Sequence, residues 1–315
     1  MAEQMRVDEF LSSLLGICHP LEPLDLPLLD AHGATLAEDI YAGERLVLRA
    51  NSHIRSTQIG LAASIGLDHL PTRPHPRVVI LSAGPDLVEP GQSLKADEEY
   101  ETNSWLLTTA VREVGAIGYR VHSIPDDEDE LLGVIEDQLV RADLIVISGE
   151  RNDDSFDLIT RTLAKMGEIT TLDLAIENSG RHNFGQIGPD KTPVVTLPTD
   201  PMTAFISFEL FVRPMIRQMF GRKNIFHPTL NAKLLEAVNF ESGAQRYIPA
   251  VLDLANSERT VDVVAIPAAT RCVGTDAGST PPFGNSAMSG RCHFPSRAIP
   301  MGTVRYVSEL AARRT

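Results

Sequence analysis

Three short runs of apolar residues recur along the chain, and each ends in a polar turn that contains glycine or proline. The runs cover residues 78–81, 144–147 and 194–197. Continuous runs of this kind, rich in valine and isoleucine, are typical of strands buried on both faces, as in a parallel sheet that helices cover. Open sheets of this type bind ligands just beyond the carboxyl ends of their strands. The pattern therefore predicts a ligand site at the three turns.

Strand-like and helix-like patterns alternate from Arg77 to Gly221, after the stiff linker Pro74-His75-Pro76. The predicted strands are 78–81, 119–124, 144–148, 169–176 and 193–197, and the predicted helices are 103–115, 126–140, 155–166 and 200–220. Repeated β-α-β units predict the α/β fold class, with a three-layer, mostly parallel sheet and right-handed crossovers.

The first 70 residues show helical spacing but no clear strand pattern. Apolar residues at helical intervals predict a helix at 7–15, and a second helix is expected from Ser56 through Ile65, ending at Gly66. Two short apolar stretches, 36–40 and 46–48, fit either strands or extended connectors. This region is therefore predicted to contain helices and turns rather than a sheet.

The pattern of residue types changes after Gly221. Two short β-type segments, 247–252 and 261–266, precede a stretch rich in glycine, serine, proline and threonine. They predict a small C-terminal β domain followed by a loose tail. The expected domains are an N-terminal helical and linker segment at 1–73, an α/β domain at 74–221 and the β domain at 222–315.

Composition narrows the function classes. A formal net charge of −14 opposes general nucleic-acid binding, which needs a basic stripe that the sequence does not show. No apolar run approaches the ~20 residues of a transmembrane helix, and the first residues lack a signal-peptide core, so a cytoplasmic protein without membrane insertion is expected. The three cysteines are too few and scattered for a disulfide framework and are expected to be reduced. The acidic run at 126–130 is expected to open a helix, because carboxylates there complement the helix dipole.

The polar segment after the second apolar run carries the densest set of chemically capable groups. Main-chain amides of Ser148 and Gly149 suit a phosphate at a helix N-terminus. The segment continues with Asp153, Asp154 and Asp157. Carboxylates are the hard oxygen ligands that Mg²⁺ prefers. A solvated helix-capping cluster is the alternative interpretation.

The other strand-end turns carry weaker signals. Ser82-Ala83-Gly84-Pro85-Asp86 lets backbone amides approach a ligand, and Asp86 is a candidate for holding a metal or a water. A tight turn without a ligand explains the same residues equally well. Thr102 or Asn103 is expected to cap the following helix, and a second role toward a ligand stays open.

The turn after the third apolar run contains two prolines. Pro198 and Pro201 would make the loop rigid, while Asp200 is expected to cap the next helix. His182, beside Arg181, is expected at the surface. The sequence contains no Ser-His-Asp arrangement, P-loop or Rossmann glycine fingerprint.

Four stretches become recognisable as a set. They are Arg77-Val-Val-Ile-Leu-Ser-Ala-Gly-Pro-Asp-Leu-Val-Glu-Pro-Gly-Gln, Tyr100-Glu-Thr-Asn-Ser, Ala142-Asp-Leu-Ile-Val-Ile-Ser-Gly and Leu197-Pro-Thr-Asp-Pro-Met-Thr-Ala-Phe. In this order they resemble the MoeA/gephyrin E-domain family, the molybdopterin molybdotransferases, and a more diffuse likeness covers 5–70. The resemblance implies Mg²⁺-assisted insertion of molybdate into adenylylated molybdopterin, with release of AMP, in a homodimer whose site lies at these strand ends.

Several site motifs depart from the pattern of that family. Where the family reads Thr-Gly-Asp-Glu-Leu, this chain reads Ala83-Gly84-Pro85-Asp86-Leu87, and the family's Lys-Pro-Gly-Lys-Pro corresponds to Glu177-Asn178-Ser179-Gly180-Arg181. A carboxylate beside a phosphate, in place of a cation, reverses a Coulomb energy of ~1 to 4 kcal/mol at about 4 Å. The family's second domain is missing, and a look-alike of its Asn-Ser-Ala-Met motif occurs only at 282–290.

The expected function is that of a molybdopterin molybdotransferase-family protein of molybdenum cofactor biosynthesis, with reduced or no activity. If the chain is catalytic, the catalytic and metal-binding residues are Asp86, Asp154 and Asp157. The residues expected to contact the pterin or its phosphate are Ser82, Gly84, Thr102, Asn103, Ser148, Gly149, Arg181, Pro198 and Pro201. The alternative is a non-catalytic, gephyrin-like dimeric scaffold that binds a protein partner such as a receptor or a cell-division component.

Overall fold

The computed structural model describes residues 4–83, 87–95, 98–124, 127–150, 153–176, 179–227, 233–234, 245, 247, 250–253 and 260–263. The chain forms two compact units. The first comprises Met1–Leu87 and Glu101–Phe226, and the second comprises Val88–Tyr100 and His227–Thr315. The domain boundaries predicted near residues 73 and 221 stay predictions.

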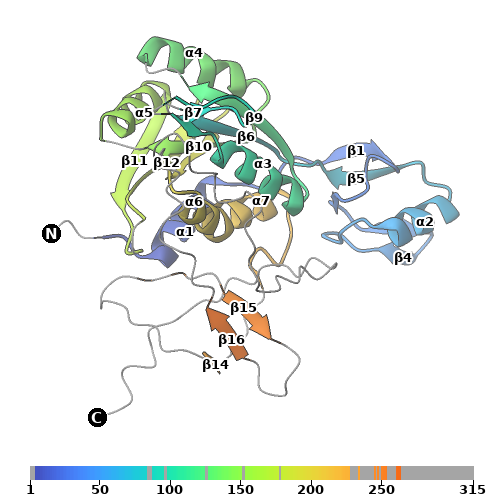
Figure 1. Ribbon diagram of the computed structural model, residues 1–315. Coiled ribbons are helices and arrows are strands. Elements are labelled where there is room, and N and C mark those ends of the chain that lie inside the picture. Colours follow the sequence, from blue (N-terminus) through green and yellow to red (C-terminus); the bar gives the residue numbers. More distant parts are fainter. Residues whose placement is uncertain are drawn as a thin grey trace. The chain divides into compact units, whose positions relative to one another are not determined.

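A six-stranded sheet forms the centre of the first unit (Figure 1). Its strands are β6 (Arg77–Ala83), β9 (Ile117–Ile124), β10 (Leu144–Glu150), β11 (Gly167–Asp173), β12 (Arg181–Ile187) and β13 (Thr192–Pro198), in the spatial order β11-β12-β13-β10-β6-β9. The strands β13, β10, β6 and β9 run parallel, whereas β12 is antiparallel to both of its neighbours. The mostly parallel sheet is confirmed, and β12 is a strand that the apolar pattern does not predict.

Helices cover both faces of this sheet. On one face lie α4 (Glu128–Leu139) and α5 (Asp153–Met166), and on the other lie α3 (Asn103–Val114), α6 (Pro201–Ser207) and α7 (Arg213–Met219) (Figure 1). Val79, Leu81 and Ile145 pack in one core with side chains of α4 and α5. Because side chains alternate along a strand, the buried Val78 and Ile80 between them belong to the opposite layer. The predicted three-layer arrangement of doubly buried strands is confirmed.

The helix predicted at 200–220 is continuous but not uniform. After α6 the chain makes a π-helical segment, η1 (Phe208–Val212), and then α7, which ends at Met219. Pro214 lies in the first turn of α7. It has no N–H to donate into the preceding turn, and its ring would crowd a carbonyl there. The wider π turn accommodates this proline without ending the helix.

The N-terminal region contains the two predicted helices and also a sheet. The helices are α1 (Val7–Ile17) and α2 (Ser56–Ser64). The expectation that this region has no sheet is wrong. An antiparallel sheet is formed by β1 (Leu24–Pro27), β5 (His69–Arg73) and β2 (Thr35–Leu36), and β3 (Ile40–Ala42) pairs with β4 (Arg45–Leu48). Strands of only two to five residues are too short to show a clear alternating pattern.

Helix α1 is tied to parts of the chain that are far away in sequence. The ring of Phe10 lies 5.4 Å from that of Phe184 in an edge-to-face contact. The side-chain amide of Gln218 donates to the carbonyl of Leu15 at 2.8 Å and also to that of Cys18. These bonds satisfy carbonyls that the C-terminus of a helix leaves without partners. Cys18 itself is a free, buried thiol, as expected.

The second unit contains short strands. The strand β7 (Leu87–Val88), at the border of the two units, pairs with β8 (Glu99–Tyr100). A three-stranded sheet has the order β14 (Lys233–Leu234), β16 (Thr260–Val263), β15 (Ala250–Asp253), which agrees with the predicted small β domain. The remaining predicted features, Cys272, Cys292 and the segment 274–290, lie outside the described residues. None of the described helices combines the length and apolarity that a transmembrane span requires.

Candidate functional site

The carboxyl ends of β6, β10 and β13 lie next to one another, as the three apolar runs predict. In the strand register, Ser148 of β10 pairs with Ser82 of β6 on one side and with Leu197 of β13 on the other. Ser82 and Ser148 are both buried. The predicted site residues Gly84 and Asp86 lie outside the described residues.

Asn103, the first residue of α3, joins these strand ends. Its side-chain amide nitrogen donates to Ser148 Oγ at 2.8 Å and to the carbonyl of Thr199 at 2.7 Å. Ser148 Oγ in turn donates to the carbonyl of Pro198 at 3.1 Å. The structure thus brings together three of the predicted ligand residues, Asn103, Ser148 and Pro198.

One atom of this cluster has no partner. Asn103 is only 6% exposed, and its Oδ1 makes no hydrogen bond with any residue that the structure describes. A buried acceptor without a donor costs about 1–3 kcal/mol. The strand-end cluster therefore offers a free acceptor to a ligand that carries an N–H or O–H group.

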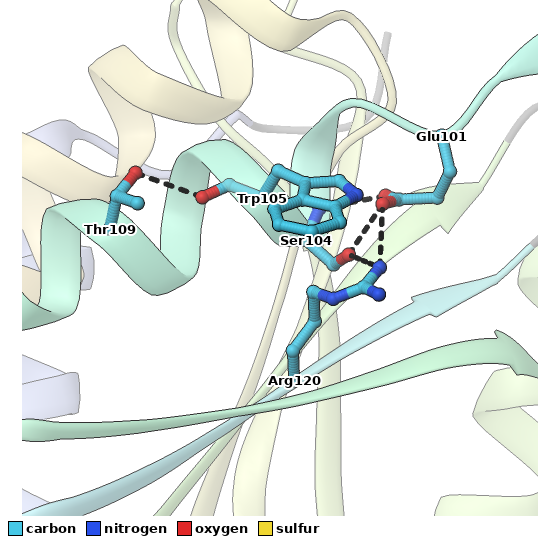
Figure 2. A network of polar contacts seen from close by, with 5 residues as sticks. All are labelled: Glu101, Ser104, Trp105, Thr109 and Arg120. Carbon is cyan, nitrogen blue, oxygen red and sulfur yellow. Dashed lines mark hydrogen bonds and ion pairs between the residues drawn. The ribbon is translucent and has the colours of Figure 1, made fainter. Parts of the chain in front are cut away.

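Asn103 is available for this role because another residue caps α3. Thr102 occupies the N-cap position but makes no capping hydrogen bond with its side chain. The carboxylate of Glu101 instead accepts a bond from Ser104 N at 2.7 Å and another from Ser104 Oγ at 2.5 Å (Figure 2). A carboxylate here also complements the positive end of the helix dipole. Sequence reasoning missed Glu101, although an acidic residue just before a helix is a known signal of a helix start.

Arg120 of β9 completes the polar network in Figure 2. Its Nη1 lies 3.5 Å from Glu101 Oε2 and 3.2 Å from Ser104 Oγ, and its guanidinium lies 4.2 Å from the ring centroid of Trp105. The pairing offsets the cost of holding the Glu101 carboxylate at 2% exposure. The network fixes the first turn of α3 and hence the position of Asn103. Nothing in the sequence around Arg120 indicates this contact, because it depends on the placement of β9.

The predicted metal ligands Asp154 and Asp157 lie on α5. Asp154 is exposed, and Asp157 forms an ion pair with Arg181, with Oδ1 and Nη1 3.6 Å apart. The Arg181 guanidinium also lies 4.1 Å from the ring centroid of Phe156. Among the residues that the structure describes, no group of three or more His, Cys, Asp or Glu side chains could hold a metal ion. The Mg²⁺ site at Asp86, Asp154 and Asp157 stays a prediction.

Asp200 caps α6 as predicted. Its Oδ2 accepts bonds from Thr203 N at 2.8 Å and from Thr203 Oγ1 at 2.7 Å, and Pro201 is the first residue of the helix. Glu101 likewise complements the dipole at the N-terminal end of α3. The protein's own carboxylates thus complement both helix dipoles at this edge, so an anionic ligand here would need an additional cation.

The expectation that His182 lies at the surface is wrong, because the residue is on the unpredicted strand β12 and is fully buried. Its Nε2 lies 2.7 Å from Ser179 Oγ and its Nδ1 lies 3.1 Å from the carbonyl of Thr196. A neutral imidazole with Nδ1 protonated satisfies both partners. Burial lowers the pKa of His182 from 6.5 to about 4.

The fold is an α/β domain with a buried polar cluster at the carboxyl edge of a mostly parallel sheet. Residues 79–218 match the protein-family model described as "Probable molybdopterin binding domain". The chain is 29% identical over 211 residues to molybdopterin molybdenumtransferase 1 of Mycobacterium tuberculosis, and 31% identical over 222 residues to molybdopterin molybdenumtransferase 2 of the same organism. The chain belongs to the MoeA family.

Solved structures agree with this fold. A molybdopterin biosynthesis moeA protein from Pyrococcus horikoshii matches 82% of this chain and 90% of its own length, with a TM-score of 0.64 at 17% identity. A molybdenum cofactor biosynthesis protein from Pyrococcus furiosus matches 84% of this chain and 88% of its own length, with a TM-score of 0.60 at 20% identity. The alignments to the two M. tuberculosis relatives cover 67% and 69% of this chain but only 49% and 54% of those relatives. The chain thus spans about half the length of the curated relatives that it matches.

Proposed function

We propose that the strand-end site binds a molybdopterin-type pterin and that the chain acts in molybdenum cofactor biosynthesis. The reaction would be the insertion of molybdate into adenylylated molybdopterin, with release of AMP. The observation that carries this proposal is the buried Oδ1 of Asn103, which has no donor among the described residues. The pyrimidine ring of a pterin carries N–H donors, and a single well-placed donor would satisfy this oxygen.

The other predicted residues would act around this contact. Ser82, Ser148 and Gly149 would present backbone groups to the ligand, and Pro198 with Pro201 would form the rigid wall. A divalent cation at Asp86, Asp154 and Asp157 would supply the positive charge that the edge lacks, since Mg²⁺ prefers carboxylate oxygens. For Arg181 to contact a phosphate, it would exchange its ion pair with Asp157 for one with the ligand.

Binding can be followed with the chain's single tryptophan, Trp105, which lies two residues after Asn103. We expect molybdopterin to change the Trp105 fluorescence, with a stronger effect when Mg²⁺ is present. We expect Asn103→Leu to weaken molybdopterin binding at least tenfold. Circular dichroism checks that this variant is folded. AMP release from adenylylated molybdopterin with molybdate and Mg²⁺ tests the reaction itself. The proposal would be contradicted if the wild-type chain showed no pterin binding and no AMP release.

Two observations favour a second candidate, the non-catalytic dimeric scaffold. Carboxylates already complement the N-terminal ends of α3 and α6, which disfavours an anionic substrate. The framework residues Phe208 and Phe211 are meanwhile fully buried, as in a chain kept for its packing. The scaffold predicts dimers in analytical ultracentrifugation and capture of a protein partner, without any fluorescence response to pterin. Pterin binding with AMP release in the absence of a partner decides for the enzyme.

A further inference from the structure

Three arginines lie on α7 and just after it, in a protein with a formal net charge of −14. We call Arg213, Arg217 and Arg222 the arginine cluster. Arg213 and Arg217 are four residues apart on α7 and therefore lie on one face of the helix. Arg222 lies three residues after Met219, the last residue of α7. Like charges at this spacing repel each other unless something offsets them.

A left-handed turn brings Arg222 back to the helix. Gly221 has φ +68°, and its N–H donates to the carbonyl of Gln218 at 2.7 Å. Arg222 N then donates to the carbonyl of Arg217 at 3.0 Å, which closes the end of α7. A β-carbon on Gly221 would lie 2.7 Å from Arg73 Nε, so the turn is also packed against β5. The position of Arg222 is thus set by the fold and is not a consequence of a free chain end.

Two members of the cluster have a structural role. Arg213 Nη1 lies 3.5 Å from Glu209 Oε1. Arg222 Nη1 lies 3.4 Å from the carbonyl of Val114 at the last turn of α3, where a cation complements the helix dipole. Its guanidinium also lies 4.3 Å from the ring centroid of Phe220.

Arg217 has no such role. No hydrogen bond or ion pair links its side chain to any residue in the described part of the chain, and its Nε, like those of Arg213 and Arg222, is buried without a partner. The pKa of Arg217 is lowered, first by burial and then by Arg213. The pKa of Arg222 is lowered to about 10, first by burial and then by Arg217 and Arg213. No carboxylate contributes to either shift, so the positive charge at Arg217 is not compensated by the described residues.

We propose that the arginine cluster binds a tetrahedral oxyanion of the phosphate class, with Arg217 as the principal contact. The planar guanidinium group donates two parallel hydrogen bonds and matches the oxygens of such an anion, which a compact ammonium group cannot do. A dianion would offset the repulsion within the cluster and supply acceptors for the donors of Arg217.

This site is separate from the strand-end site and does not depend on the proposed function. Asn103 is the first residue of α3, and Val114, which Arg222 contacts, is the last. A helix of 12 residues is ~18 Å long at 1.5 Å per residue. A phosphate at the arginine cluster would therefore bind together with a pterin at the strand ends.

The test uses the full chain and titrates inorganic phosphate by calorimetry at constant ionic strength. We expect saturable binding and a rise in the thermal unfolding midpoint. We expect Arg217→Gln to weaken phosphate binding at least tenfold and Arg217→Lys to weaken it less, because lysine keeps the charge but loses the planar fork. Arg45→Gln, at an exposed arginine of β4, is the matched control and should bind like the wild type.

A parallel titration with AMP separates the two sources of the anion. Tighter binding of AMP than of phosphate supports the phosphate of a nucleotide, and the reverse order supports a free oxyanion. The proposal is overturned if phosphate has no effect beyond that of ionic strength, or if Arg45→Gln loses as much affinity as Arg217→Gln. It is also overturned if Arg217→Gln abolishes a dimer of the chain while phosphate has no effect. If Arg217→Gln does not fold, Arg217→Lys decides the same question.

Discussion

At the first turn of α3, Asn103 has a buried acceptor oxygen without a donor, whereas on α7 the buried Nε donor of Arg217 has no acceptor among the described residues. The helix itself does not need either group. Glu101 complements the dipole at the first turn, and Arg222 complements it at the last. The difference teaches that the strand-end site has a surplus acceptor and the arginine cluster a surplus donor, which points to a donor-bearing ligand at the first and an anion at the second.

The largest effect is expected from a substitution in the turn after α7, which positions Arg222. Gly221→Ala would place a residue with a β-carbon at φ +68° and 2.7 Å from Arg73 Nε. The left-handed backbone costs roughly 1–2 kcal/mol and the clash about 1–3 kcal/mol, so we expect a loss of about 3 kcal/mol in the free energy of unfolding. Urea denaturation followed by Trp105 fluorescence measures it.

Gly43→Ala is the matched control for this substitution. Gly43 has a similar φ of +63°, but a β-carbon there meets nothing within 4 Å. We expect a loss of only about 1 kcal/mol, which is the backbone cost alone. Equal losses in the two variants would show that Arg73 does not hold the turn that positions Arg222.

The buried side chain of His182 has partners for both ring nitrogens, and it can be compared with the unpartnered groups of Asn103 and Arg217. His182 is neutral in the folded chain, with its pKa lowered to about 4 by burial, and binds a proton near pH 6.5 when unfolded. The unfolded chain therefore binds more protons between these values, and stability falls as the pH drops from 6.5 toward 4. The expected loss at pH 5 is about 2 kcal/mol relative to neutral pH.

The measurement is the free energy of unfolding as a function of pH. His182→Asn should reduce the slope of the profile between pH 6.5 and 4, with a smaller contribution left from His53, whose pKa is also lowered by burial. His69→Gln, at an exposed histidine whose pKa is raised by Asp68, should keep the slope, because only a histidine with a lowered pKa produces it. A His182→Asn profile parallel to the wild type would exclude His182 as its cause.

A double titration sharpens the comparison between the two ends of α3. Asn103→Leu should weaken pterin binding about tenfold or more and leave phosphate binding unchanged, and Arg217→Gln should do the reverse. Tenfold corresponds to about 1.4 kcal/mol. Fluorescence of Trp105 reports the pterin and calorimetry reports the phosphate. If either variant weakens both ligands equally, the two ends are one site or one folding defect.

The smallest effect is expected at Ser148. Ser148→Ala removes the acceptor at 2.8 Å from the Asn103 side chain, but that side chain keeps its bond to the carbonyl of Thr199. We expect a loss of about 1 kcal/mol in stability and a smaller loss of pterin affinity than in Asn103→Leu. Thermal unfolding and the fluorescence titration measure the two quantities. A larger loss of affinity than in Asn103→Leu would move the ligand contact from Asn103 to Ser148.

The elements that the sequence predicts are those that bury apolar side chains. The strands β6, β10 and β13 are recognisable because both of their faces are covered, and this burial demands continuous apolar runs. The strand β12 is missed because it buries His182 and Asn183, whose polar side chains are satisfied by hydrogen bonds with residues of other elements. Hydrophobicity carries no signal for burial of that kind.

The candidate site is predictable to a similar extent. Asn103 and Ser148 stand at strand and helix ends that the pattern locates, so their meeting follows from the topology. The role of Arg120 does not follow, because it depends on the register of β9 against α3. The arginine cluster shows its i, i+4 spacing in the sequence, but only the left-handed turn at Gly221 brings Arg222 to it.

The bond from Gln218 to the C-terminal end of α1 has a consequence for how the chain is made. Gln218 and Leu15 are 203 residues apart in the sequence. At synthesis rates of ~5–20 residues per second, α1 exists for roughly ten to forty seconds before Gln218 is made. During that interval the apolar side chains of Phe10 and Leu14 have no native partner from α7 or η1. Helix α1 therefore completes these contacts only after η1 and α7 have been made.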